Sequence, residues 1–146
     1  MTDHRIFASD EEIFTIVHGI TERTLPKPQW THAAHFAAAV GLLSQRSIAE
    51  VGARMPGLIR AYNESTGVAN TDSSGYHETI TQASLRAARS FLDQHPDLPL
   101  HQALNALLAS PYGRSDWLLR YWSKVRLFSV EARRHWCEPD LLSLPF

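Results

Sequence analysis

Apolar residues in this chain recur every three to four positions, in segments that prolines and polar, glycine-containing stretches separate. Ile13, Ile16 and Ile20 form one such stripe, and this spacing places side chains on one face of a helix. No segment alternates apolar and polar residues convincingly, as a strand of a half-buried sheet would. The pattern therefore predicts an all-α fold.

Capping patterns and prolines set the expected helix boundaries. Ser9 with Glu12 and Ser47 with Glu50 have the spacing of capping boxes, Thr31 is a candidate N-cap, and Pro56 should kink or split its helix. We expect six helical segments: Asp10 to Arg23, His32 to Leu43, Ile48 to Tyr62, Tyr76 to His95, Leu100 to Leu108 after Pro99, and Ser115 to His135. The polar stretch from Gly67 to Gly75 should be a loop, with Ser73, Ser74 and Gly75 as the cap of the following helix.

The length of 146 residues is that of one domain, so we expect residues 1–146 to form a single bundle of five to six helices. The net charge of −1, without a run of Lys and Arg, predicts no binding of nucleic acid or of a membrane surface. Cys137 is the only cysteine, which excludes an intrachain disulfide and fits a reducing compartment. We therefore expect a bacterial-type, cytoplasmic protein whose partner is a small molecule; the oligomeric state stays open.

Two histidines begin the second expected helix. His32 and His35 lie three residues apart, so their side chains occupy neighbouring turns on one side of the helix. The positive end of the helix dipole disfavours the imidazolium form there, and a neutral imidazole is the form that binds a metal ion. This pair is a candidate for two ligands of one metal.

A third histidine begins the fourth expected helix, in the segment Gly-Tyr-His-Glu-Thr-Ile-Thr from Gly75 to Thr81. His77 followed by Glu78 resembles half of the His-Glu-x-x-His motif of zinc peptidases, but Thr81 stands where the second histidine belongs. His32 and His35 could supply what Thr81 lacks. Three histidines with an open fourth position are what a catalytic divalent metal requires, and Glu78 would act as the general base or as a fourth ligand.

Several other interpretations compete with this site. Any of these histidines could instead be a structural histidine that hydrogen bonds a backbone carbonyl. The apolar stripe of Trp117, Tyr121 and Trp122 could dock a partner helix, although core packing explains it more simply. The chain has no Glu-x-x-His segment, no His-Asp dipeptide and no phosphate-binding glycine loop, which argues against a di-iron bundle, a His-Asp phosphohydrolase and a P-loop enzyme.

The motifs Trp30-Thr-His-x-x-His35, Tyr62-Asn63, Gly75-Tyr-His-Glu-Thr-Ile-Thr81 and Ser129-x-Glu-Ala-Arg133, with Trp136-Cys-Glu-Pro-Asp140, resemble an uncharacterised family of small bacterial helical proteins. The resemblance covers residues from about 25 to 145 and implies no activity. It marks as functional candidates Trp30, His32, His35, Asn63, His77, Glu78 and Arg133.

The leading hypothesis from the sequence is a metal-dependent enzyme for a small molecule, most simply a hydrolase. In this hypothesis His32, His35 and His77 bind zinc, or alternatively nickel, iron or copper, and Glu78 is the catalytic base. Residues expected to bind the substrate are Tyr62, Asn63, Tyr76 and Arg133. The rival hypothesis is a non-catalytic helical module that binds a metal or another ligand.

Overall fold

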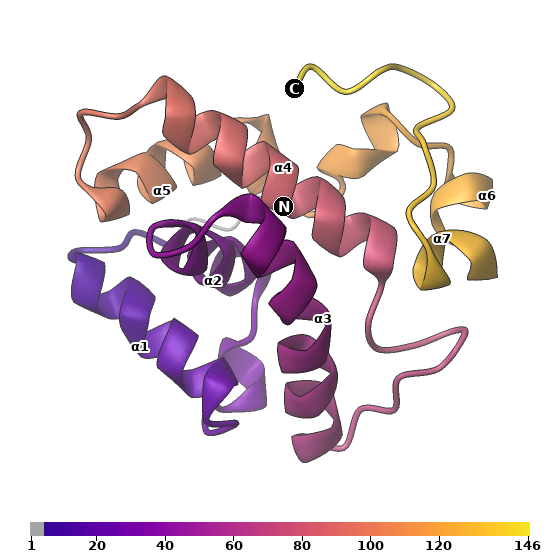
Figure 1. Cartoon of the computed structure of the whole chain (residues 1–146), viewed down its shortest axis with the longest axis horizontal. Coiled ribbons are helices and arrows are strands. Elements are labelled where there is room, and N and C mark those ends of the chain that lie inside the picture. The colour runs from indigo at the N-terminus through magenta and orange to yellow at the C-terminus, as the bar shows by residue number, and fades with distance from the viewer. Residues whose placement is uncertain (1–4) are drawn as a thin grey trace.

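The computed structural model describes residues 5–146 and contains no strand in this range, which confirms the all-α fold (Figure 1). The α-helices are α1 (Asp10–Thr21), α2 (His32–Leu43), α3 (Ile48–Ser65), α4 (Glu78–Gln94), α5 (Leu100–Ala109), α6 (Lys124–Leu127) and α7 (Val130–Arg134). Short 3₁₀ helices are η1 (Lys27–Gln29), η2 (Pro111–Gly113) and η3 (Trp117–Arg120).

Helix α2 is the most deeply buried helix in the described chain. All but two of its 12 residues are buried, and it packs against α1, α3, α4 and α5. The two residues left less buried are His32 and His35 at its N-terminal end. Thr31 caps this helix by accepting a hydrogen bond from the backbone N–H of Ala34, as expected. Helix α4 crosses the molecule above α2 and reaches the C-terminal helices, where it packs against α7 (Figure 1).

The expected long helix from Ser115 to His135 is wrong. The structure divides this segment into η3, α6 and α7. Ser123 and Ser129 each accept a hydrogen bond from the backbone N–H three residues later, so each serine starts a new short helix. The carboxylate of Asp140 also accepts hydrogen bonds from the backbone N–H and the hydroxyl of Ser123, which fixes that break.

The stripe within this segment packs inward, because Trp117 and Trp122 are both buried in the core. The Trp122 indole also donates a hydrogen bond to the backbone carbonyl of Cys137. These two side chains are therefore not free to dock a partner helix in the described fold.

Pro56 lies inside α3, and the helix continues through it instead of splitting. A proline has no N–H to donate to the carbonyl four residues earlier, which here belongs to Gly52. The side-chain amide of Gln82 on α4 donates to that carbonyl at 3.1 Å. A neighbouring helix thus supplies the hydrogen bond that Pro56 cannot make.

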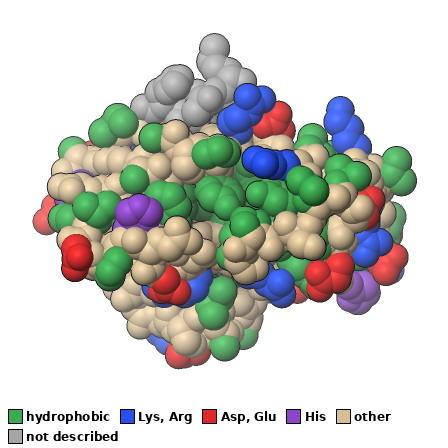
Figure 2. Space-filling model, turned by 90° about the horizontal axis from the view of Figure 1, so that it is seen from above, with side chains coloured by type: hydrophobic (Ala, Val, Ile, Leu, Met, Phe, Trp, Pro, Cys, Tyr) green, Lys and Arg blue, Asp and Glu red, His purple; other side chains and the backbone are tan. Residues whose placement is uncertain are grey.

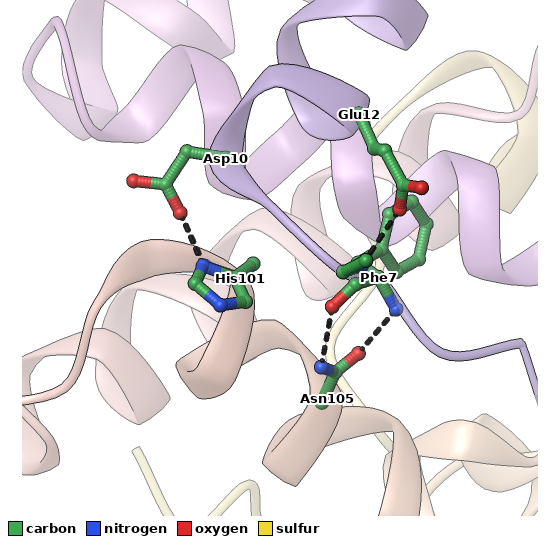
Figure 3. A network of polar contacts seen from close by, with 6 residues as sticks. Phe7, Asp10, Glu12, His101 and Asn105 are labelled. Carbon is green, nitrogen blue, oxygen red and sulfur yellow. Dashed lines mark hydrogen bonds and ion pairs between the residues drawn. The ribbon is translucent and has the colours of Figure 1, made fainter.

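The N-terminal segment is fastened to α5 by side-chain contacts (Figure 3). The carboxylate of Asp10 accepts hydrogen bonds from the backbone and the ring of His101, and these bonds lower the pKa of Asp10. The side-chain amide of Asn105 accepts a hydrogen bond from the backbone N–H of Phe7 and donates one to its carbonyl. His101 therefore has a structural role here.

The face shown in Figure 2 carries hydrophobic side chains across its middle and charged side chains toward its margins. None of the helices within residues 5–146 combines the length and the apolar character needed to cross a lipid bilayer.

Two glycine substitutions test this fold in opposite directions. Gly75 has a φ of +80°, and an added Cβ would lie 2.6 Å from the carbonyl oxygen of Ala69. We expect Gly75→Ala to lower the free energy of unfolding by about 1–3 kcal/mol. Gly57 lies in α3 with no atom within 4 Å of an added Cβ, so Gly57→Ala should raise it by about 0.5–1 kcal/mol. Urea denaturation measures both, and equal effects of the two substitutions would contradict the described loop conformation.

Candidate functional site

A cavity of about 390 Å³ lies between the N-terminal end of α2, the first turns of α4 and the C-terminal segment around η3 and α6. Its walls are mainly apolar, with a few polar side chains among them. The lining residues are His32, His35, Phe36, Ile80, Ser84, Ser115, Asp116, Leu118, Leu119, Leu127 and Phe128. Two of the three histidines that the sequence singled out therefore share one cavity.

The ring of His32 is oriented by a backbone carbonyl. Its Nε2 lies 2.8 Å from the carbonyl oxygen of Tyr112, and a carbonyl only accepts, so Nε2 carries the proton. The ring also packs edge-on against Phe36, one turn further along α2, with 5.2 Å between the ring centroids. In the neutral ring Nδ1 keeps its lone pair, and it has no hydrogen-bond partner within the described chain.

His35 is held in the opposite tautomer. Its Nδ1 lies 2.7 Å from the carbonyl oxygen of Thr31 and therefore carries the proton, which leaves the lone pair on Nε2 without a partner in the described residues. The indole of Trp30 stacks on the ring, with 3.7 Å between the centroids. Each of the two histidines thus retains one acceptor nitrogen.

The charge state of His35 depends on two opposing influences. The residue as a whole keeps part of its surface open to solvent, whereas the stacked indole of Trp30 covers one face of the ring. Desolvation is the main cause that lowers the pKa of His35, the bond to Thr31 opposes this shift, and the nearby His32 adds to it. His35 is consequently neutral at neutral pH.

His77 uses both of its ring nitrogens inside the protein. Nε2 donates to the carbonyl of Leu127 at 2.7 Å, and Nδ1 accepts from the backbone N–H of Ile80 at 3.2 Å. His77 is therefore the N-cap of α4, in place of the expected Ser73, Ser74 and Gly75. The ring is buried, and desolvation is the main cause of its lowered pKa.

The three histidines do not assemble into one ligand set. Within residues 5–146, no three side chains of His, Cys, Asp or Glu are grouped so that they could hold a metal ion. His32 and His35 line the cavity, whereas His77 has no lone pair left for a metal in this arrangement. Metal binding by these histidines stays a prediction.

Glu78, the expected general base, lies in the first turn of α4 and outside the cavity lining. Its Oε1 accepts a hydrogen bond from the hydroxyl of the buried Tyr76. Burial raises the pKa of Tyr76, and the bond to Glu78 raises it further. Gln82 also donates to Glu78, at 3.4 Å, so the carboxylate is engaged by two neighbours.

The remaining expected substrate-binding residues hold the chain in place and do not line the cavity. The hydroxyl of Tyr62 donates to the carbonyl of Leu25. Asn63 donates to the side chain of Asn70, which also accepts the backbone N–H of Tyr76. Arg133 donates to two backbone carbonyls on the same segment, those of Gly75 and Tyr76. The contacts of Asn63 and Arg133 hold the loop that leads into α4, whereas that of Tyr62 holds the segment between α1 and η1.

The sequence interpretation missed most of the cavity wall. Phe36 lies one turn after His32, and Ser84 lies one turn after Ile80, so helical spacing alone could have placed these pairs on common faces. Helical spacing does not place Leu118 and Leu119, because the long helix expected over this segment does not form. They lie on the short helix η3, which ends before the breaks at Ser123 and Ser129.

The lowered pKa values of His35 and His77 predict a loss of stability in mild acid. Histidine in the unfolded chain has a pKa of 6.5, whereas the folded value for His35 is about 4 and that for His77 is also lowered. As the pH falls through this range, the unfolded chain binds protons that the folded rings do not, so unfolding becomes more favourable. We expect the Tm to fall between pH 6.5 and about 4.

Substitutions of His35 and His77 test whether these two rings cause the fall of Tm in acid. His35→Gln combined with His77→Asn should give a shallower fall of Tm over the same pH range, and Asn at position 77 keeps an N-cap acceptor. A slope unchanged by the double substitution would show that other groups cause the acid sensitivity.

No family model, curated protein or solved structure matches this chain. The roles of its residues are therefore inferred from the cavity and the contacts around it.

Proposed function

We propose that this protein binds a small, uncharged and largely apolar molecule that carries a hydroxyl or N–H donor. One observation carries the proposal. His32 and His35 line one mainly apolar cavity, and a backbone carbonyl fixes each ring in the tautomer that leaves an acceptor nitrogen without a partner.

The acceptor nitrogens define the polar chemistry of the ligand. A neutral imidazole nitrogen that lacks a proton can only accept a hydrogen bond, so the ligand must supply the donor. Ser84 already donates its hydroxyl proton to the carbonyl of Ile80, which leaves it as a further acceptor. A carboxylate ligand would bring lone pairs toward lone pairs and would lose its hydration in an apolar cavity.

The size and charge of the cavity fit the same class of ligand. Its volume of about 390 Å³ lies within the range of about 300–1,000 Å³ that is usual for small-molecule sites. The one acidic side chain in the lining, Asp116, accepts two hydrogen bonds from Arg114 at 3.0 and 3.2 Å. This ion pair leaves no unbalanced carboxylate in the cavity wall, which favours an uncharged occupant.

Naphthol, a neutral aromatic with one hydroxyl donor, is a suitable probe. We expect isothermal titration calorimetry to give a Kd below about 1 mM for the parent protein. Ser84→Leu places a larger side chain at the cavity wall and should weaken the binding of naphthol by about tenfold or more. Ser90→Leu makes the same change on α4 outside this cavity and should leave the affinity nearly unchanged.

A second variant keeps this test informative if Ser84→Leu disturbs folding. His35→Phe removes the acceptor nitrogen while it keeps an aromatic ring beside Trp30, and it should also weaken the binding of naphthol. Circular dichroism monitors the fold of each variant. The proposal fails if naphthol does not bind the parent protein, or if both cavity variants bind it as well as the parent does.

Metal-dependent hydrolysis is the second candidate, and the same pair of histidines supports it. The partnerless nitrogens of His32 and His35 could both bind one divalent ion, with zinc as the first choice and nickel, iron or copper as alternatives. Water or substrate would occupy the other positions of such an ion. A cytoplasmic location in a bacterium belongs to the same proposal, and the single, buried and unpaired Cys137 fits it.

Elemental analysis of the protein purified without an affinity tag and supplied with zinc tests this second candidate. If the pair binds zinc, His32→Ala and His35→Ala should each lose it, whereas His77→Asn should retain it. Loss of zinc in His77→Asn would instead support the three-histidine set. Zinc content below about a tenth of an equivalent in the parent protein would reject metal binding at this cavity, since two neutral imidazoles at one site should retain the ion.

A further inference from the structure

A second hollow, of about 440 Å³, opens beside the cavity and is lined by residues around η2 and η3. We call it the aromatic cleft, and its lining includes Tyr112, Arg114, Asp116, Trp117, Arg120 and Tyr121. In a 3₁₀ helix, residues three apart lie on one side. Trp117 and Arg120 therefore face the cleft together, while Leu118 and Leu119 of the same turn line the cavity.

Aromatic rings form the walls of the aromatic cleft. Trp117 meets Tyr112 edge to face, with 5.0 Å between the ring centroids, and it meets Tyr121 in a similar way at 6.1 Å. Tyr112 and Tyr121 are only partly buried. Their contacts with Trp117 hold the rings in fixed orientations, so a planar ligand could pack against them without ordering a flexible wall.

One hydrogen-bond donor in a residue that lines the aromatic cleft lacks an acceptor. The indole Nε1–H of Trp117 is the one buried side-chain polar atom with no hydrogen-bond partner in the described part of the chain. Such a group is costly unless an acceptor is supplied. No atom of residues 5–146 supplies one to Trp117.

The charge of the aromatic cleft also favours an acceptor. Asp116 is engaged by Arg114 in an ion pair with two hydrogen bonds. Arg120 forms no ion pair with a carboxylate among residues 5–146. With two guanidinium groups against one carboxylate, the lining carries a net positive charge, and a guanidinium group binds carboxylates in a fixed planar geometry.

We propose that the aromatic cleft is a second binding site, and that it takes an aromatic carboxylate. The ring of the ligand packs against Tyr112 and Tyr121, and its carboxylate accepts hydrogen bonds from Arg120. The two sites then select opposite chemistries. The cavity presents acceptors to a neutral donor, and the cleft presents donors to an anion.

Naphthoate is the matched probe, because it has the ring system of naphthol with a carboxylate in place of the hydroxyl. We expect calorimetry to detect naphthoate binding with a Kd below about 1 mM, and naphthamide to bind at least about tenfold more weakly. Arg120→Gln should weaken the binding of naphthoate by about tenfold or more. Lys124→Gln removes one positive charge from an exposed residue that does not line the cleft, and should change the affinity by less than about twofold.

The location of the bound anion is tested separately. Addition of naphthoate should shift the indole N–H resonance of Trp117 in the ¹H–¹⁵N NMR spectrum, and Ser84→Leu should leave this shift and the affinity unchanged. The proposal is overturned if naphthoate does not bind, or if Arg120→Gln binds it as well as the parent protein. It is also overturned if Ser84→Leu abolishes the binding, because the anion would then occupy the cavity.

Discussion

Backbone carbonyl oxygens fix the protons of three imidazole rings, and the chemistry of this protein depends on that constraint. The carbonyls of Tyr112, Thr31 and Leu127 each accept a hydrogen bond from one ring nitrogen, on His32, His35 and His77 respectively. The other nitrogen of each neutral ring must then be an acceptor. On His77 this acceptor caps α4, whereas on His32 and His35 it has no partner within the described chain. The same kind of interaction therefore makes the ring of His77 structural and leaves the rings of His32 and His35 available to a ligand.

The short 3₁₀ turn η3 separates two environments of opposite character. Leu118 and Leu119 give the cavity part of its apolar wall, and Trp117 and Arg120 give the neighbouring cleft an aromatic wall and a cation. Tyr112 connects the two sites, because its ring lines the cleft while its carbonyl orients His32 in the cavity. A shift of Tyr112 would therefore alter both sites, because its ring and its carbonyl belong to one residue.

The sequence predicted the all-α fold because apolar spacing and capping residues are local signals. Thr31 and Ser47 cap their helices as expected, and both cavity histidines were found from their positions at the start of α2. The missed features depend on partners distant in the chain. Gln82 supports the helix through Pro56, Asp140 fixes the break at Ser123, and Asn70 organises the loop before α4. The sequence pattern of His77 is compatible with a metal ligand and with an N-cap, and only its contacts with Ile80 and Leu127 distinguish the two.

The most direct test of this account is a long-range ¹H–¹⁵N NMR spectrum of the imidazole nitrogens at neutral pH, recorded without and with naphthol. The account predicts a proton on Nε2 of His32 and of His77, and on Nδ1 of His35. Naphthol should then shift the unprotonated nitrogens of His32 and His35 and leave those of His77 in place. A doubly protonated His35 at neutral pH, or a response to naphthol confined to His77, would contradict the account.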